Sequence, residues 1–79
     1  MKTEYKYIHS IEVEGEGKTK VFHVLDESNN FLGVIKWYVQ CRSYCIMPGL
    51  KVIYDASCLA DIQYFLNQLM QERKSKKEK

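Results

Sequence analysis

Three cysteines and two histidines are the residues of this chain best suited to chemistry. Cys41 and Cys45 are separated by three residues, Cys58 follows, and His9 and His23 lie nearer the N-terminus. Zinc takes four nitrogen or sulfur ligands, so this set could in principle supply a site. The spacing matches no familiar zinc knuckle, however, and an extended strand would hold Cys41 and Cys45 apart unless a turn brings them together. We therefore expect no bound metal.

A reactive thiol is the second chemistry that the cysteines suggest. A catalytic cysteine needs a cationic or histidine-paired environment, and Arg42 beside Cys41 is the one such neighbour in sequence. An odd number of cysteines cannot all pair within one chain, and in a cytosolic protein they are expected to stay reduced. We expect Cys45 and Cys58 to pack as small apolar side chains.

Other catalytic patterns are weak or missing. Glu12, Glu14 and Glu16 cluster around a glycine turn, and paired carboxylates can hydrolyse glycosides, but acids beside a turn are expected to be solvated. His9 and His23, on neighbouring predicted strands, could meet across the ladder. The chain has no dinucleotide fingerprint, phosphate-binding loop, nucleophile elbow or HExxH motif. The sequence therefore predicts neither an enzyme nor a cofactor.

The stretch GVIKWYVQCRSYCIMPG, residues 33–49, favours binding over catalysis. It contains the single Trp of the chain, Trp37, which we expect to pack beneath a helix because its area would dominate so small a core. Tyr and Arg are enriched at protein-binding hot spots and also stack on unpaired bases. A plain amphipathic hairpin is the alternative. The residues predicted to share the outward surface and bind a partner are Lys36, Tyr38, Arg42 and Tyr44.

Alternating and helical periodicities predict the elements that must position these residues. Period-two alternation marks strands, and the glycines at 15–17 and the sequence DESNN at 26–30 mark turns. Residues 31–39 place an apolar face on Phe31, Gly33, Ile35, Trp37 and Val39. The strands expected are 5–13, 19–25, 31–39 and 44–47, with a short fifth at 51–54.

After residue 54 the apolar spacing changes to three or four, which predicts a helix from about 57 to 72. Asp55 or Ser57 would cap its first turn. The positions that make its apolar face are Cys58, Leu59, Ile62, Phe65, Leu66, Leu69 and Met70. The fold class predicted is α+β: a four- to five-stranded antiparallel meander with one C-terminal helix packed on one face. The opposite face must be polar or covered by a partner.

Length and charge limit the number of domains and the classes of partner that the sequence supports. The 79 residues suit one domain at 1–72 with a basic disordered tail at 73–79. Residues 72–79 carry five basic and two acidic residues, whereas residues 1–71 carry seven basic and eight acidic ones, so the body is not a strongly basic nucleic-acid binder. No apolar run approaches the ~18 residues of a membrane span, and the N-terminus lacks a secretory core. We expect a cytoplasmic protein with no membrane association.

The second half of the chain resembles small uncharacterised proteins of bacteriophage and mobile-element genomes. Their pattern is G-x-[IV]-x-W-Y, then R-x-Y-C-x-x-P, then C-L-x-D-I-x-x-F. The residues that fit it are Gly33, Ile35, Trp37, Tyr38, Arg42, Tyr44, Cys45, Pro48, Cys58, Leu59, Asp61, Ile62 and Phe65. Cys41 stands where the pattern has Trp, and Ile46 where it has an aromatic residue, which argues against an aromatic stacking surface.

The resemblance implies an origin rather than an activity. Small phage accessory proteins often act by binding proteins of the host cell, including components of its defence systems. The sequence thus supports a non-enzymatic binding protein of the host cytoplasm that masks a host protein or forms a homo-oligomer. The alternative is a nucleic-acid-binding module that uses the Tyr and Arg side chains of the hairpin and the basic tail. A small enzyme or metal protein is the third and least favoured class.

Overall fold

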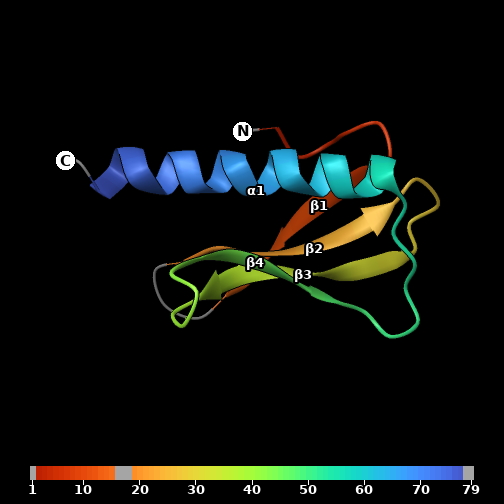
Figure 1. Ribbon diagram of the computed structural model, residues 1–79, viewed down its shortest axis with the longest axis horizontal. Coiled ribbons are helices and arrows are strands. Elements are labelled where there is room, and N and C mark those ends of the chain that lie inside the picture. The colour runs from red at the N-terminus through yellow and green to blue at the C-terminus, as the bar shows by residue number, and fades with distance from the viewer. Residues whose placement is uncertain (1, 16–18, 78–79) are drawn as a thin grey trace.

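The computed structural model describes residues 2–15 and 19–77, which form one sheet and one long helix (Figure 1). The elements are β1 (Ile8–Val13), β2 (Val21–Asp26), β3 (Phe31–Tyr38), β4 (Ser43–Pro48) and α1 (Ala56–Lys77). The sheet is antiparallel with order β1-β2-β3-β4, and α1 lies across one of its faces (Figure 1). The predicted α+β meander with a C-terminal helix is confirmed.

The turn between β2 and β3 is built by one carboxylate. Asp26 accepts hydrogen bonds from the main-chain N–H groups of Ser28 (2.8 Å) and Asn30 (2.9 Å), and from the Asn30 side-chain amide (3.1 Å). Asn29 takes a left-handed φ of 68°, which asparagine tolerates better than most residues. The sequence DESNN therefore reverses the chain as its composition predicts.

These hydrogen bonds to Asp26 make the stability of the protein depend on pH. Hydrogen bonds from the Asn30 main chain, then from its side chain and from Ser28, with the charge of His9, hold the pKa of Asp26 below its usual range. Because the folded pKa is lowered, the stabilisation is present above the unfolded pKa of about 3.9 and is lost as pH falls through the folded value.

Replacing Asp26 with Asn should weaken this pH dependence, because the amide oxygen still accepts hydrogen bonds but does not titrate. Urea-unfolding midpoints at about pH 5 and about pH 2.5 measure it: the drop between them should be smaller in Asp26→Asn than in the wild type. An equal drop in both proteins would show that Asp26 contributes nothing to acid sensitivity.

The core lies between the sheet and α1. Phe22 on β2 and Phe65 on α1 are both fully buried, and their rings meet edge to face with centroids 4.9 Å apart. Ile62 and Leu69 lie on the same helix face as Phe65, at the spacing that one face of a helix requires. Helix and sheet thus share one apolar layer, as the spacing in the sequence predicts.

On β1 the face turned toward α1 is the even-numbered one, and it includes a buried serine. Ser10 is 6% exposed, and its Oγ has no hydrogen-bond partner among the described residues. A buried hydroxyl without a partner loses its hydration and gains nothing in return.

Ser10→Ala is therefore expected to stabilise the protein by about 1 kcal/mol, which for a domain of this size raises the melting temperature by about 4–8 °C. Thermal unfolding followed by circular dichroism checks this. A lower melting temperature would mean that Ser10 has a partner after all, such as an ordered water.

The helix begins where the sequence predicts but ends later than predicted. Asp55 caps it by accepting a hydrogen bond from the Cys58 N–H (2.8 Å), so of the two caps proposed Asp55 is the one used. The helix continues past Glu72 to Lys77. The Arg73 guanidinium packs 3.8 Å from the centroid of the Trp37 ring, which attaches this turn to the sheet. Residues 73–77, predicted as tail, are therefore helical. Residues 78 and 79 lie outside the described residues.

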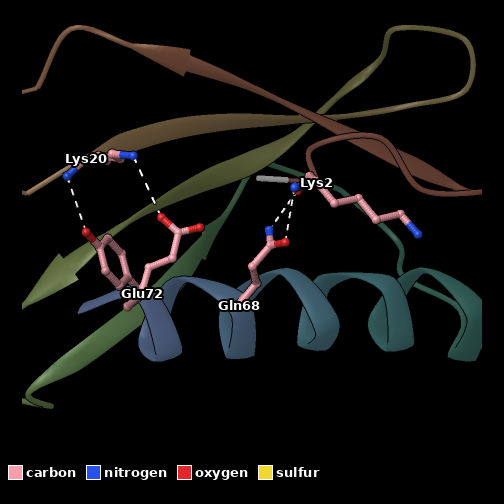
Figure 2. A network of polar contacts seen from close by, with 5 residues as sticks. Lys2, Lys20, Gln68 and Glu72 are labelled. Atoms are coloured by element: carbon pink, nitrogen blue, oxygen red, sulfur yellow. Dashed lines mark hydrogen bonds and ion pairs between the residues drawn. The ribbon is translucent and has the colours of Figure 1, made fainter. Parts of the chain in front are cut away.

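Two polar contacts hold α1 to segments far away in sequence. Figure 2 shows Gln68 bonding both main-chain groups of Lys2: its oxygen accepts from the Lys2 N–H (3.1 Å) and its amide donates to the Lys2 carbonyl (2.7 Å). One turn on, Glu72 lies 3.9 Å from the ammonium of Lys20, just before β2 (Figure 2). The helix is thus attached to the N-terminal segment and to the residue that precedes β2. Within residues 2–15 and 19–77, no helix combines the length and apolarity that a membrane crossing requires.

The predicted fifth strand, residues 51–54, is wrong. This segment is a loop, held because the Leu32 carbonyl accepts two hydrogen bonds, from the Gly49 N–H (2.9 Å) and from the Tyr54 hydroxyl (2.6 Å). Lys51 has a positive φ of 56°, which turns the chain out of an extended path. The alternation of Leu50, Val52 and Tyr54 resembles that of a strand, but these residues belong to a loop. This loop, residues 49–54, is called the clamped loop below because both of its ends bond to the Leu32 carbonyl.

Candidate protein-binding face

The face of the sheet away from α1, hereafter the open face, has no helix or strand over it among the described residues (Figure 1). On each strand its residues alternate with those that point into the core. Its members are His9, Ile11, Val13, Val21, His23, Leu25, Phe31, Val34, Lys36, Tyr38, Ser43, Cys45 and Met47.

A continuous row crosses the middle of the open face. The pairing register sets Ile11 opposite His23, His23 opposite Val34, and Val34 opposite Met47. The ends of the row are half exposed, Ile11 at 51% and Met47 at 49%. Residues directly opposite one another on neighbouring strands lie within side-chain contact, so this row forms one largely apolar band.

A β-bulge adds Phe31 to the open face. Leu25 pairs with Phe31 and Val24 with Gly33, so Leu32 is an extra residue between them, and it turns into the core. The prediction that Phe31 shares a face with Trp37 is therefore wrong. The Phe31 ring instead meets His23 edge to face, with centroids 5.4 Å apart, and is 45% exposed.

The open face carries no carboxylate. Among its residues Lys36 alone bears a fixed charge, and the Lys36 ammonium lies 5.3 Å from the centroid of the Tyr38 ring. The nearest acids on the same strands, Glu12 and Asp26, fall on the alternate register positions. A partner that covers this face would therefore desolvate apolar side chains and no acidic group, which lowers the cost of burial.

Three of the four predicted partner-binding residues lie at or near this face. Lys36 and Tyr38 are half-buried on it, and Arg42 is exposed at the tip of the β3–β4 hairpin with a positive φ of 51°. The Tyr38 hydroxyl is shielded from solvent and has no hydrogen-bond partner within residues 2–15 and 19–77, so the ring is the part of Tyr38 that a partner protein could contact. The structure thus brings Lys36 and Tyr38 together near the hairpin tip.

The outward position predicted for Tyr44 is wrong. Tyr44 is 8% exposed and lies on the helix side of the sheet, where its hydroxyl accepts a hydrogen bond from the Lys20 N–H (3.3 Å). The cause is register: Tyr44 pairs with Trp37, and paired residues share a face. Their rings meet edge to face with centroids 5.5 Å apart. The predicted position of Trp37 beneath the helix is confirmed, and Tyr44, as its pairing partner, lies on the same side of the sheet.

The cysteines are not arranged as a metal site or as activated nucleophiles. Cys41 is exposed at the hairpin tip and Cys58 packs against the core at the start of α1. A hydrogen bond to the Cys45 thiol raises the pKa of Cys41, and burial followed by the Asp55 carboxylate raises that of Cys58. Such thiols stay protonated near neutral pH. Across the described ranges, no three His, Cys, Asp or Glu side chains come together as ligands would.

The two histidines do not face each other. The register places His9 opposite Leu25 and His23 opposite Ile11, so the two histidines, which the sequence left free to meet across the ladder, sit diagonally on the open face. Of the three clustered glutamates, Glu12 and Glu14 are exposed and Glu16 lies outside the described residues. None of these groups forms an acid–base pair in the described part of the chain.

The loop that follows β4 is the feature that sequence reasoning missed. Leu50 is 97% exposed and Ile53 is 90% exposed, although the loop is clamped to the Leu32 carbonyl at both ends. Figure 1 shows this loop extending beyond the sheet on the side away from α1. The sequence does show two large aliphatic residues, Leu50 and Ile53, on either side of Lys51 and Val52. Because a strand was predicted here, these two were not recognised as exposed loop residues.

A shallow pocket of about 480 Å³ lies between the N-terminal segment and α1. The polar groups along it already serve the fold: Asp61 accepts a hydrogen bond from the Tyr7 N–H (2.9 Å), and Gln68 is bonded to Lys2. The Lys2 ammonium lies 4.6 Å from the centroid of the Tyr5 ring. These contacts attach the N-terminal segment to the helix, and they leave the open face as the stronger candidate site.

Comparison with known proteins gives one informative relative. The chain is 34% identical over 71 residues to a protein of Acholeplasma phage L2 named "Uncharacterized 9.3 kDa protein", and the alignment covers 87% of this chain and 91% of the relative. No protein-family model matches the chain, and no solved structure matches it.

Proposed function

The chain belongs to the family of the 9.3 kDa protein of Acholeplasma phage L2, and from this we propose that it is a small phage-type accessory protein that acts without catalysis, by binding another protein. The partner in this proposal is a host protein that the chain masks or a further copy of the chain. The contact is made through the open face.

The exposed apolar band on the open face carries the proposal. A sheet of this size normally buries one face and presents a polar second face to water. Here the second face presents Ile11, Phe31 and Met47, each about half exposed, around His23 and Val34. Contiguous exposed apolar surface of this kind is typical of protein-interaction sites.

Two matched substitutions test the proposal. Ile11 on the open face and Leu59 on α1 are almost equally exposed, at 51% and 52%, so Ile11→Glu and Leu59→Glu introduce the same charge at sites of equal accessibility. In binding measurements with nuclease-treated host extract, Ile11→Glu should reduce retention of the wild-type partner at least about tenfold, as expected when a charge must be buried in an apolar contact. Leu59→Glu should leave it unchanged. Equal retention by both variants would contradict the use of the open face.

Arg42→Ala is expected to separate binding from stability. Arg42 is exposed, and its side chain makes no hydrogen bond or ion pair with the described residues, so truncation of that side chain should change the free energy of unfolding by less than about 0.5 kcal/mol. Arginine at the rim of an interface contributes to recognition, so partner affinity should fall. Urea unfolding and binding measured on the same preparation check both parts. A large loss of stability would show that Arg42 is structural.

A nucleic-acid partner is the second candidate, and one observation favours it. Residues 36–44 contain Lys36 and Arg42 and no acid. Two cations and the Tyr38 ring are a small surface, since the burial of Tyr44 removes one of its aromatic residues. Backbone binding would weaken steeply with salt. Affinity for single-stranded DNA or RNA at low salt that is lost in Lys36→Ala would favour this candidate over a protein partner.

A further inference from the structure

We infer that the open face is the interface of a two-fold dimer, in which a second copy of this chain covers it and the two sheets pack face to face as a sandwich. The inference rests on the proposed function, because it names the protein that binds the open face. Aligned sheets pack about 10 Å apart with strand directions within about 30° of each other.

The area of the flat sheet alone is too small for such an interface. Four strands about 4.8 Å apart and six residues long, at about 3.3 Å per residue, give a face about 19 Å wide and about 20 Å long. Two such faces together offer about 800 Å², whereas specific interfaces begin at about 1,200 Å² in total. A stable dimer therefore needs surface beyond the sheet, and it must come from the same side.

The clamped loop after β4 supplies that surface. Leu50 and Ile53 are nearly fully exposed, and the loop extends on the open side of the sheet (Figure 1). Its two anchoring hydrogen bonds converge on the Leu32 carbonyl, so its shape exists before binding. A preorganised loop loses little conformational entropy on association, and protruding aliphatic side chains of this kind serve as anchors.

The loop and the open face are one continuous surface. Gly49 begins the loop, and a Cβ placed on it would lie 3.3 Å from the Phe31 ring and 3.1 Å from Val52. Phe31 in turn contacts His23, which belongs to the central row. The loop therefore adjoins the open face at Phe31, and Leu50 and Ile53 follow Gly49 within four residues along the chain.

The charged residues at the two ends of the sheet indicate how the second copy is oriented relative to the first. The end of the sheet with the β2–β3 turn and the clamped loop carries Asp26, Glu27 and Asp55 against Lys51. The β3–β4 hairpin tip lies at the opposite end of the sheet (Figure 1) and carries Lys36 and Arg42 and no acid. Glu12 and Glu14 lie at that same end of the sheet, but on and just after β1, at the edge away from β4. In this dimer the two-fold axis lies in the interface and runs perpendicular to the strands. It therefore places the hairpin tip of each copy over the acidic end of the other copy. Because a two-fold contact is made twice, every favourable pair is doubled.

Burial of Lys36 is compatible with this arrangement. Lys36 lies toward the tip, beyond the central row, and its pairing partner is Cys45. A lysine stem can lie along apolar surface while its ammonium reaches the rim. In the antiparallel dimer that rim is where the partner's acidic end arrives, and no carboxylate of the open face has to be desolvated.

Sedimentation velocity of the purified chain, from about 1 to about 200 µM, tests the inference. We expect the wild type to shift from monomer to dimer, and Leu50→Glu and Ile53→Glu each to weaken the dimer at least about tenfold. Both positions are almost fully exposed, so these variants should fold as the wild type does, and Leu59→Glu should dimerise normally. A dimer unaffected by Leu50→Glu and Ile53→Glu would overturn the inference.

A charge exchange tests the direction of packing. Arg42→Glu and Glu27→Arg should each weaken the dimer about fivefold, and the two changes in one chain should restore it, as expected for exposed opposite charges. Absence of restoration would overturn the antiparallel arrangement.

A wild type that stays monomeric at about 200 µM would overturn the second copy as the partner. The proposed function would still stand in that case if Ile11→Glu, but not Leu59→Glu, loses a partner from host extract. If the substitutions reduce neither the binding of a partner from host extract nor dimerisation, both the proposed function and the dimer are rejected.

Discussion

Phe65→Ala is expected to lower the free energy of unfolding by about 3–5 kcal/mol. Phe65 is fully buried at the centre of the helix face and contacts aromatic rings on both sides, Phe22 at 4.9 Å and Tyr5 at 6.3 Å between centroids. The substitution leaves a cavity that a small core cannot fill. A domain of this length has a total stability of about 4–12 kcal/mol, so the substitution would remove a large share of that stability.

Urea unfolding followed by circular dichroism measures this loss. Tyr64→Ala is the matched control, because Tyr64 precedes Phe65 on the same helix and is 68% exposed. The control should change stability by less than about 0.5 kcal/mol. A loss of less than about 1 kcal/mol for Phe65→Ala would mean that α1 is not packed on the sheet as described.

Trp37→Ala is expected to cost about 3 kcal/mol, the lower end of the range for large aromatic residues, because Trp37 is only partly buried. Its ring is held between two elements: it meets Tyr44 of β4 edge to face and receives the Arg73 guanidinium from α1. Loss of the ring would therefore detach the last turns of the helix as well as open the core.

Thermal unfolding by circular dichroism checks the effect, since removal of the single Trp also removes the fluorescence signal. Val39→Ala, at a position 75% exposed two residues further on, serves as the control and should leave the melting temperature within about 2 °C of the wild type. An unchanged melting temperature for Trp37→Ala would invert the face assignment of β3 and, with it, the identity of the open face.

Local chemistry made much of the fold predictable. The turn at 26–30 follows from Asp26 and Asn29, and the helix start follows from Asp55, because each of these residues acts within a few positions of itself. The side of Trp37 followed from alternation along a single strand. Each of these predictions depends on one segment, so the rest of the chain could not change it.

Features set by pairing between strands were not predictable in the same way. The face of Tyr44 depends on how many residues the β3–β4 tip takes, and one residue more or less turns every side chain of β4 to the other side. Phe31 changed face because of the bulge at Leu32, which composition does not reveal. The candidate site inherits this limit: Lys36 and Tyr38 were found, whereas Tyr44 was misplaced and Phe31 was overlooked.

Tertiary contacts account for the remaining differences. Arg73 was predicted in a basic tail, and its contact with Trp37 joins residues far apart in sequence. The clamped loop was predicted as a strand because Val52 and Tyr54 alternate with exposed residues, and only the shared Leu32 carbonyl distinguishes the two. Exposure of Leu50 and Ile53, and hence the full extent of the proposed binding surface, follows from that clamp.

Hydroxyl-radical footprinting tests most directly whether the open face is the binding surface. Oxidation of Met47 and Phe31 on the open face is compared with that of Leu59 and Tyr64 on the outer side of α1, in dilute chain, in concentrated chain and in host extract. Met47 and Phe31 should become protected in at least one of the two assembled conditions, while Leu59 and Tyr64 oxidise at their dilute rates. Protection of Leu59 and Tyr64 with Met47 and Phe31 unchanged would contradict the account.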